Sequence, residues 1–263
     1  SWGPRDETED ARAPEPETPR AAARRRRVVA LVRALFRVAV DGGDGGADDA
    51  GAAFVLEVLN AVTTELADLV AKDDAGSREF VRALNRERTR MVDLGPAFPF
   101  LAGLLLTALD AFLRARDVDA ILVAMMLAQS FYRRRGETRE YLKVPLQVHP
   151  VWADAAFWPD ALDALIGRQK ASTGDDEAAN DDAGCASAVL GATFYCGPGQ
   201  EAERLARWSQ LGGVVHAMLE FGVAPDAVLT FVDDTCKAHR VDDGQRKTLV
   251  DHVMAQRPGI SEA

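Results

Sequence analysis

The sequence has little of what a disulfide-linked or sheet-dominated fold requires. Three cysteines stand in 263 residues, and this odd number does not form the even sets found in small secreted disulfide scaffolds. Valine and isoleucine are scattered, and apolar and polar residues do not alternate over any strand-length run. The sequence therefore predicts a chain that resides in a reducing compartment and folds without a large sheet.

Positive charge is also in short supply. The 41 acidic residues exceed the 31 basic ones, which gives a net charge of −10. Because DNA and RNA are bound chiefly through cationic surfaces that neutralise phosphates, a nucleic-acid partner is not expected. The first residues show no apolar signal segment, although a start at Ser1 rather than methionine suggests a fragment of a longer chain. A cytoplasmic location is expected.

The strongly apolar stretch 94–109 is the nearest approach to a membrane-spanning segment. It is shorter than the roughly 20 residues that a spanning helix needs, and it contains Pro96 and Pro99. Hydrophobic residues nevertheless make up 48% of the chain, which is enough for a sizeable core. The stretch is therefore predicted to be a buried core helix preceded by a loop.

The sequence lacks the motifs of common hydrolases and phosphate-binding proteins. It has no Gly-x-Ser-x-Gly elbow and no His-Glu-x-x-His pair. The glycine-rich run 42–46 is flanked by aspartates, whose carboxylates repel phosphate, and no Gly-Lys-Ser/Thr follows it. We therefore predict a non-catalytic protein that has no cofactor and no small-molecule substrate.

Two cysteine settings leave alternatives open. Cys196 lies in the loop-like run Phe194–Gly199, and as a nucleophile it would need a nearby base or cation to lower its thiol pKa. A cysteine-dependent enzyme is thus the second alternative to an adaptor. Cys236 and His239 have the spacing of two zinc ligands, but a structural zinc site takes four. Cys236 is therefore expected to face the core.

Apolar residues at spacings of three and four predict helices along most of the chain. The predicted fold is all-α: a single multi-helix domain of antiparallel helix pairs, with no sheet of consequence. Pro150 and Pro225 suit the first position of a helix, and Ser77 is expected to cap one. The predicted helices cover residues 24–40, 49–72, 77–84, 101–114, 117–134, 150–169, 201–221, 225–236 and 249–254.

Two polar segments are predicted to lie outside the packed core. Residues 1–20 are expected to form a disordered tail, and the acidic segment 172–184 a solvated loop. The domain itself is expected to span residues 21–256, followed by a short tail at 257–263. The apolar seam from Leu205 to Met218 is too long to leave in water, so the residues after the loop are expected to dock on the first half and share one core.

Arg24–Arg27 is the strongest local charge signal. The apolar face behind it, with Val28, Val32 and Phe36, makes the segment a basic amphipathic helix, and such a helix can bind an anionic membrane surface or a partner. The preferred interpretation is structural: the helix docks on the core, and its arginines meet the acidic surface of the same chain. Arg133–Arg135 are expected to close a helix and to complement the negative end of its dipole.

Aromatic residues make up only 7% of the chain, and several of them gather between residues 131 and 158. Large aromatic side chains either fill cores or anchor partners. The group is predicted to form one buried cluster against the helix that holds Leu104 to Phe112. Because the last three members cannot all point one way along a helix, at least two of them are expected in the core. The group consists of Phe131, Tyr132, Trp152, Phe157 and Trp158.

The order of these and neighbouring residues resembles the SET-binding-factor domain. The resemblance covers roughly residues 77–254 and rests on the order and aromatic identity of short motifs. The matching motifs are Phe80-Val81, Arg86-Glu87-Arg88, Ala128-Gln129-Ser130-Phe131-Tyr132, Tyr141-Leu142-Lys143, His149-Pro150-Val151-Trp152, Phe157-Trp158, Leu211-Gly212, Met218, Phe221-Gly222-Val223 and Phe231-Val232.

The resemblance implies an α-helical interaction module that binds a protein partner. In the large myotubularin-related pseudophosphatases, this domain lies beside a guanine-nucleotide exchange domain and an inactive phosphatase, in proteins of endosomal traffic. It also occurs in small stand-alone cytoplasmic proteins. This chain lacks the phosphatase Cys-x5-Arg loop, because Ala202 stands where the arginine would follow Cys196. An adaptor or scaffold is therefore expected; the first alternative is a membrane-peripheral regulator of vesicle traffic that uses Arg24–Arg27.

Overall fold

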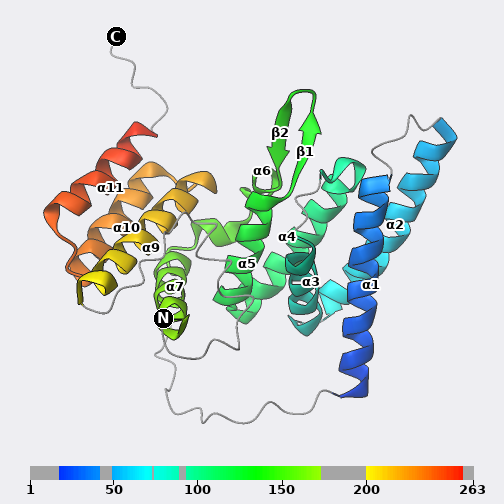
Figure 1. The fold of residues 1–263 in the computed structure, drawn as a ribbon, viewed down its shortest axis with the longest axis horizontal. Helices are drawn as coiled ribbons and strands as arrows, with labels where there is room; N and C mark the ends of the chain where they lie inside the picture. Colours follow the sequence, from blue (N-terminus) through cyan, green and yellow to red (C-terminus); the bar gives the residue numbers. More distant parts are fainter. Residues whose placement is uncertain (1–17, 42–48, 73, 89–92, 173–199, 257–263) are drawn as a thin grey trace.

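The computed structural model describes residues 18–41, 49–72, 74–88, 93–172 and 200–256. They form an elongated row of helices, with the first two helices at one end and the last three at the other (Figure 1). The predicted all-α class is confirmed, since the only sheet among the described residues has two strands. Residues 1–17 of the predicted tail 1–20, residues 173–184 of the predicted loop 172–184, and the predicted tail 257–263 lie outside the described residues.

Four helices pack together in the first half of the chain. The four helices are α1 (Pro19–Asp41), α2 (Asp49–Lys72), α3 (Asp74–Glu87) and α4 (Phe98–Ala115). A short 3-10 turn, η1 (Gly95–Ala97), precedes α4. α1 packs on α2 and α3, and both of these pack on α4. Because α1 starts at Pro19, the helix begins inside the predicted tail; proline is favoured in a first turn, where its missing N–H needs no partner.

Ser77 does not cap a helix as predicted. α3 begins three residues earlier, at Asp74, and Ser77 is fully buried. Its hydroxyl donates to the carbonyl oxygen of Val70 at 2.8 Å. Val70 belongs to the last turn of α2, whose carbonyls have no donor within the helix. The serine therefore ties the end of α2 to the start of α3.

α5 (Val118–Ser130) packs on α4, but it ends four residues before the predicted boundary at Arg134. The backbone of Phe131 is extended, with φ −90° and ψ 140°, so the helix cannot continue through it. An antiparallel hairpin follows, and Gly136 has the positive φ that its two-residue turn requires. Its strands are β1 (Tyr132–Arg135) and β2 (Thr138–Tyr141).

The hairpin accounts for the arginines that were expected to close a helix. Arg133 and Arg135 both pair with Glu140 on the opposite strand, at 2.8 and 2.6 Å. The guanidinium of Arg133 also lies 4.4 Å from the ring centre of Phe98. The hydrogen bond from Arg133 is the main cause of the lowered pKa of Glu140. The predicted role in a helix dipole is therefore wrong, because these side chains serve cross-strand pairing.

Two short elements and a longer helix then lead the chain to the second half. They are α6 (Lys143–Leu146), η2 (Pro150–Ala153) and α7 (Phe157–Ser172). Pro150 takes the first position of its helical turn, as predicted, and the side chain of His149 caps that turn. Since α7 runs to Ser172, the predicted loop at 172–184 begins at least one residue too early.

The last three helices pack against one another, and α9 also packs on α7. They are α9 (Gln200–Glu220), α10 (Pro225–Ala238) and α11 (Asp243–Ala255). Gly222, at φ +78°, lets the chain leave α9, and the N–H of Val223 then donates to the carbonyl of Met218 at 2.9 Å. Pro225 starts α10 at the predicted position.

One continuous cluster of buried apolar side chains joins the two halves. It extends from Val28 in α1 to Val253 in α11. Leu211, Val215 and Met218 of the predicted seam belong to it, whereas the side chain of Leu205 lies outside the described residues. The second half thus docks on the first through α7 and α9.

Among the described residues, one helical segment, Gly95–Ala115, is long and apolar enough to cross a membrane by length and composition alone. The uncharged stretch 94–109 suggested a segment too short to span a membrane. The helix is longer than that stretch, because it continues past Asp110. Its apolar window is 56% buried in the fold, and side chains such as Leu105 and Phe112 are fully covered. These are the properties of a core helix.

Candidate functional site

The five aromatics singled out in the sequence are all buried. Their ring contacts, however, do not form the single predicted cluster, because those of Phe131 and Tyr132 are separate from those of the group that holds the other three. Phe131 pairs with Phe36 of α1 at 5.4 Å between ring centres, and Tyr132 pairs with Tyr141 across the hairpin at 5.8 Å. The early end of α5 turns these two residues toward α1 and the hairpin, away from the three downstream aromatics.

Trp152 is the centre of the group that holds the other three aromatics. Its ring centre lies 5.9 Å from that of Phe157, 6.1 Å from that of Trp158 and 4.3 Å from that of Phe221 on α9. The indole N–H of Trp152 donates to the carbonyl of Leu146 at 2.7 Å, and that of Trp158 donates to the carbonyl of Trp152 at 3.0 Å. Both polar groups thus have partners inside the core.

A bend at Asp154 explains why all three downstream aromatics are buried. Trp152 lies in η2, whereas Phe157 and Trp158 begin α7. Between them Asp154 is extended, and its Oδ1 accepts a hydrogen bond from the N–H of Ala156 at 2.9 Å. The expectation that at least two of the three lie in the core is confirmed. Because the bend places them on two different helical elements, the third can point into the core as well.

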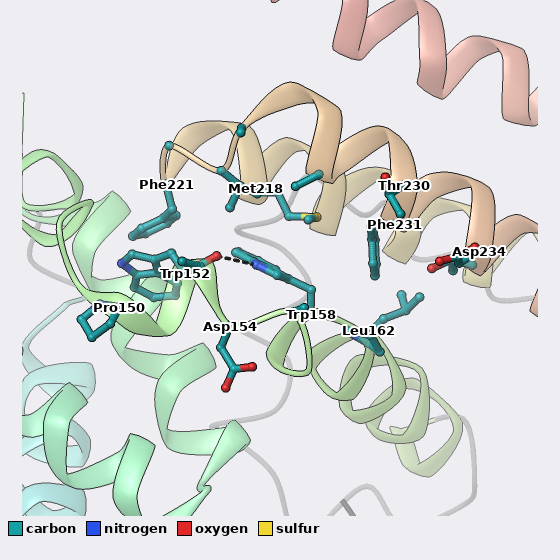
Figure 2. Close-up of a pocket in the computed structure, with 18 of the residues that line it drawn as sticks. Pro150, Trp152, Asp154, Trp158, Leu162, Met218, Phe221, Thr230, Phe231 and Asp234 are labelled. Atoms are coloured by element: carbon teal, nitrogen blue, oxygen red, sulfur yellow. Dashed lines mark hydrogen bonds between the residues drawn. The ribbon is translucent and has the colours of Figure 1, made fainter. Parts of the chain in front are cut away.

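A cavity of about 930 Å³ lies beside this aromatic group. We call it the α7–α10 cavity, because these two helices border it. In Figure 2 the side chains of Met218 and Phe231 point across it toward Trp158 and Leu162. Its apolar lining consists chiefly of Trp152, Trp158, Leu162, Met218, Phe221 and Phe231.

The rim of the α7–α10 cavity is acidic. Asp154, Asp163 and Asp234 line it, and none of the described residues around it is a lysine or an arginine. Asp163 and Asp234 are exposed, so their carboxylates face solvent at the edge. An apolar floor with carboxylates at its edge favours a ligand that combines an apolar body with positive charge.

His149 connects the lining of the cavity to α4. Its Nδ1 accepts from the N–H of Val151 at 3.2 Å, and its Nε2 lies 3.2 Å from Oδ1 of Asp110. Because Nδ1 accepts, the neutral ring carries its proton on Nε2, which then donates to Asp110. Burial lowers the pKa of His149, and the hydrogen bond to Asp110 opposes this effect.

The fold is expected to lose stability as the pH falls below about 6.5, the usual pKa of an unfolded-chain histidine. The folded-state pKa of His149 is lower, so between the two values only the unfolded chain binds the proton, and the free energy of unfolding decreases. His149→Asn keeps a cap acceptor but does not titrate. Between about pH 7.5 and about pH 5.5, its free energy of unfolding should fall less than that of the parent. Equal decreases in urea unfolding would contradict the lowered pKa of His149.

Arg24–Arg27 lies on α1, at the far end of the molecule from the cavity (Figure 1). Arg27 pairs with Glu65 of α2, with Nη2 2.6 Å from Oε2. Their hydrogen bond raises the pKa of Arg27 and lowers that of Glu65. Arg27 thus meets the acidic surface of its own chain, as the structural interpretation of this cluster expects.

Two other members of the cluster border a second, smaller hollow. Arg25 and Arg26 line it together with Arg33 of α1 and Arg86 of α3, and its volume is about 390 Å³. Arg33 also pairs with Glu87 at 3.5 Å. Four guanidinium groups therefore gather around one site on the surface of an acidic protein.

The described cysteine is structural. Cys236 is buried, as predicted, and burial raises the pKa of its thiol, which stays protonated at neutral pH. Over the described part of the chain, no three His, Cys, Asp or Glu side chains are grouped so that they could hold a metal ion. Cys185 and Cys196 lie outside that part, so the cysteine-enzyme alternative stays a prediction.

The sequence alone does not connect α10 with the aromatic group. It marks Phe221 as the end of a helix and as part of the Phe221-Gly222-Val223 motif, and it gives Asp234 no role in a site. The available signal was the spacing of Ala227, Phe231 and Asp234, which places small, aromatic and acidic residues on one helical face. Such a mixed face is unusual for a helix that is simply half-buried.

Comparison with known proteins adds no relative: no family model, no curated protein and no solved structure matches the chain. The resemblance to the SET-binding-factor domain therefore stays a prediction, and the function is inferred from the geometry of this chain.

Proposed function

We propose that this chain is a non-catalytic helical adaptor that binds a protein partner through the α7–α10 cavity. The observation that carries the proposal is the cavity itself, whose lining combines tryptophan, phenylalanine and methionine side chains. Aromatic residues and methionine are enriched where protein partners meet. At the edge of the cavity the side chain of Val148 is 80% exposed, so it is accessible to a partner.

The resemblance noted in the sequence supports the same role. Several of its motifs are distant in the chain and meet at the cavity: Trp152 and Trp158 come from one side of it, Phe221 and Phe231 from the other. A family of interaction modules would retain residues of this kind where a partner binds. The two halves of the chain thus contribute jointly to the proposed site.

A photo-crosslinking amino acid in place of Thr230 tests the proposed site in cells. Thr230 is exposed and lines the cavity, and its hydroxyl donates to the carbonyl of Asp226 one turn earlier, at 3.0 Å. We expect one discrete crosslinked protein from this position. The chain offers a matched control in Thr64 of α2, which is exposed and makes the same bond to Asn60 at 2.8 Å.

Crosslinking at Thr230 should disappear when Ala227→Trp fills the cavity, whereas crosslinking at Thr64 should give no discrete product. Ala227 is exposed on the same face of α10, so the added indole enters the cavity without displacing core residues. Equal labelling from both threonines, or labelling that Ala227→Trp does not change, would exclude the cavity as the partner site.

A second candidate function, a membrane-peripheral role, is favoured by the arginine-lined hollow on α1 and α3. Each lysine or arginine near an anionic bilayer contributes about 1 kcal/mol of binding. Arg25, Arg26, Arg33 and Arg86 together provide the cluster of cations that such binding needs. In this case the hollow, rather than the cavity, would be the functional surface.

Vesicles of phosphatidylcholine with about one-fifth phosphatidylserine test the membrane role. If it holds, Arg25→Glu/Arg26→Glu should weaken co-sedimentation by about tenfold or more, because two favourable charges become unfavourable. The control Arg114→Glu/Lys237→Glu makes the same charge change at exposed sites on α4 and α10. Equal loss in both variants, or binding unaffected by salt, would reject a specific role for the hollow.

A further inference from the structure

We infer that the partner segment bound in the α7–α10 cavity is an amphipathic helix bearing lysine or arginine beside its apolar face. The inference rests on the proposed adaptor function and names the chemistry of the partner. The apolar face of that helix lies on the aromatic floor, and its cations meet the aspartates at the rim. The form of the cavity and its charge support this assignment independently.

The α7–α10 cavity follows α10 over its whole length. The lining residues on that helix recur at steps of three and four from Ala224 to Ala238, which is one helical face. α10 has 14 residues, and a helix of that length extends about 21 Å. A partner helix of similar length therefore matches the cavity from end to end.

Small side chains border the open side of the cavity. Ala227 and Thr230 on α10 and the preceding Ala224 are exposed, and so are Ala153 and Ala155 ahead of α7. Side chains of this size let a third helix approach to the usual interaxial distance of about 8–10 Å. A small molecule is instead held by a pocket that covers most of its surface, so this open form favours a helix.

The negative charge of the rim favours a partner with positive charge. Asp163 and Asp234 stand on the two helices that border the cavity, and Asp154 lies near the tryptophan pair (Figure 2). A cation flanking the apolar face of the partner is attracted from both sides, whereas a carboxylate in that place is repelled. The described lining has no lysine or arginine, so no permanently charged cation there offsets this preference.

Asp160, in the first turn of α7, lies beside two of the rim aspartates. Its Oδ2 is buried and has no hydrogen-bond partner among the described residues. Burial raises the pKa of Asp160, and nearby Asp163 and Asp154 raise it further, against the lowering effect of Arg116. Asp154 and Asp163 of the rim thus lie close enough to Asp160 to affect it, although Asp160 does not line the cavity itself.

Two synthetic helical peptides of about 14 residues, the length that spans α10, test the inference. They share a leucine-rich face and differ only in the flanking residues, which are lysines in one and glutamates in the other. Neither contains tryptophan, so the fluorescence of the chain reports binding. At about 0.15 M salt the lysine peptide should bind at least about tenfold more tightly, a difference of about 1.4 kcal/mol.

A matched pair of charge-neutralised variants separates rim contacts from general attraction to an acidic protein. Asp163→Asn/Asp234→Asn should lower the affinity for the lysine peptide by about threefold to tenfold. Glu57→Gln/Asp68→Asn, at exposed sites on α2, removes the same charge and should leave its affinity unchanged. Ala227→Trp should abolish binding of the lysine peptide.

Three results would overturn the inference: equal binding of the two peptides, equal effects of the two double variants, or n-octylammonium binding as tightly as the lysine peptide. The last result would assign the cavity to a small cationic amphiphile. If neither peptide binds while Thr230 still crosslinks a protein in an Ala227→Trp-sensitive way, the inference fails and the adaptor function stands. If that crosslinking also fails, the proposed function fails with it.

Discussion

Trp158→Ala is expected to lower the free energy of unfolding by about 3–5 kcal/mol, the range for a truncated core aromatic. Trp158 is 2% exposed, and its ring centre lies 4.9 Å from that of Phe157 and 6.1 Å from that of Trp152. Removing the indole deletes these contacts and leaves the carbonyl of Trp152 without its donor. Urea unfolding followed by far-UV circular dichroism measures the change.

Trp158→Phe separates the packing of the ring from its hydrogen bond. This variant keeps most of the aromatic contacts but loses the N–H donor to Trp152, so we expect a smaller loss of about 1–2 kcal/mol. The account of the aromatic group would be wrong if Trp158→Ala cost less than about 1 kcal/mol, the size of an ordinary surface change.

Phe221→Ala should have an effect of similar size, about 3–5 kcal/mol. Phe221 is 1% exposed and packs on Trp152, with 4.3 Å between ring centres. Polar contacts reinforce this junction: Glu220 pairs with Lys143, and its carbonyl oxygen accepts from the side-chain amide of Gln147 at 2.7 Å. Because the ring joins α9 to the first half, its removal should destabilise the helices on both sides of the junction.

The matched control for Phe221→Ala is Phe54→Ala. Phe54 lies on α2 and is 66% exposed, so removing its ring opens no core void, and alanine suits a helix. We expect a change within about 0.5 kcal/mol. Thermal or urea unfolding of both variants gives the comparison; equal losses would mean that burial of Phe221 does not determine its contribution.

The helices were predictable because their signal is local. The pattern over residues 49–72 contains the apolar repeat that defines α2, and its predicted bounds match those of the structure. Pro225 likewise fixes the start of α10, since proline suits the first turn. In these segments the spacing of side chains and the backbone chemistry agree, so no distant contact is needed to decide the outcome.

The hairpin was not predictable from the same pattern. Residues 117–134 keep a helical spacing past Ser130, yet the chain becomes extended at Phe131. What decides the outcome is pairing with residues further along the chain, between Tyr132 and Tyr141 and between Arg133 and Glu140. Cross-strand contacts of this kind override local helix propensity.

The α7–α10 cavity lies beyond local prediction for a related reason. Its floor brings Trp152 and Phe221 together across a wide separation in sequence, and periodicity does not say which buried faces meet. The sequence did identify Trp152 and Trp158 as notable side chains and placed them in the core. It did not show that α10 would leave an open, acidic face beside them, because that depends on how α9 packs on α7.

The central claim is that both halves form one cooperative fold and thereby create the α7–α10 cavity. Native-state hydrogen exchange of the full chain, with and without Phe221→Ala, tests it most directly. The account predicts that the most protected amides of α4, α5, α9 and α10 open with one shared free energy, and that Phe221→Ala lowers it equally in all four helices. Lower protection confined to α9 and α10, with α4 and α5 unchanged, would contradict the claim.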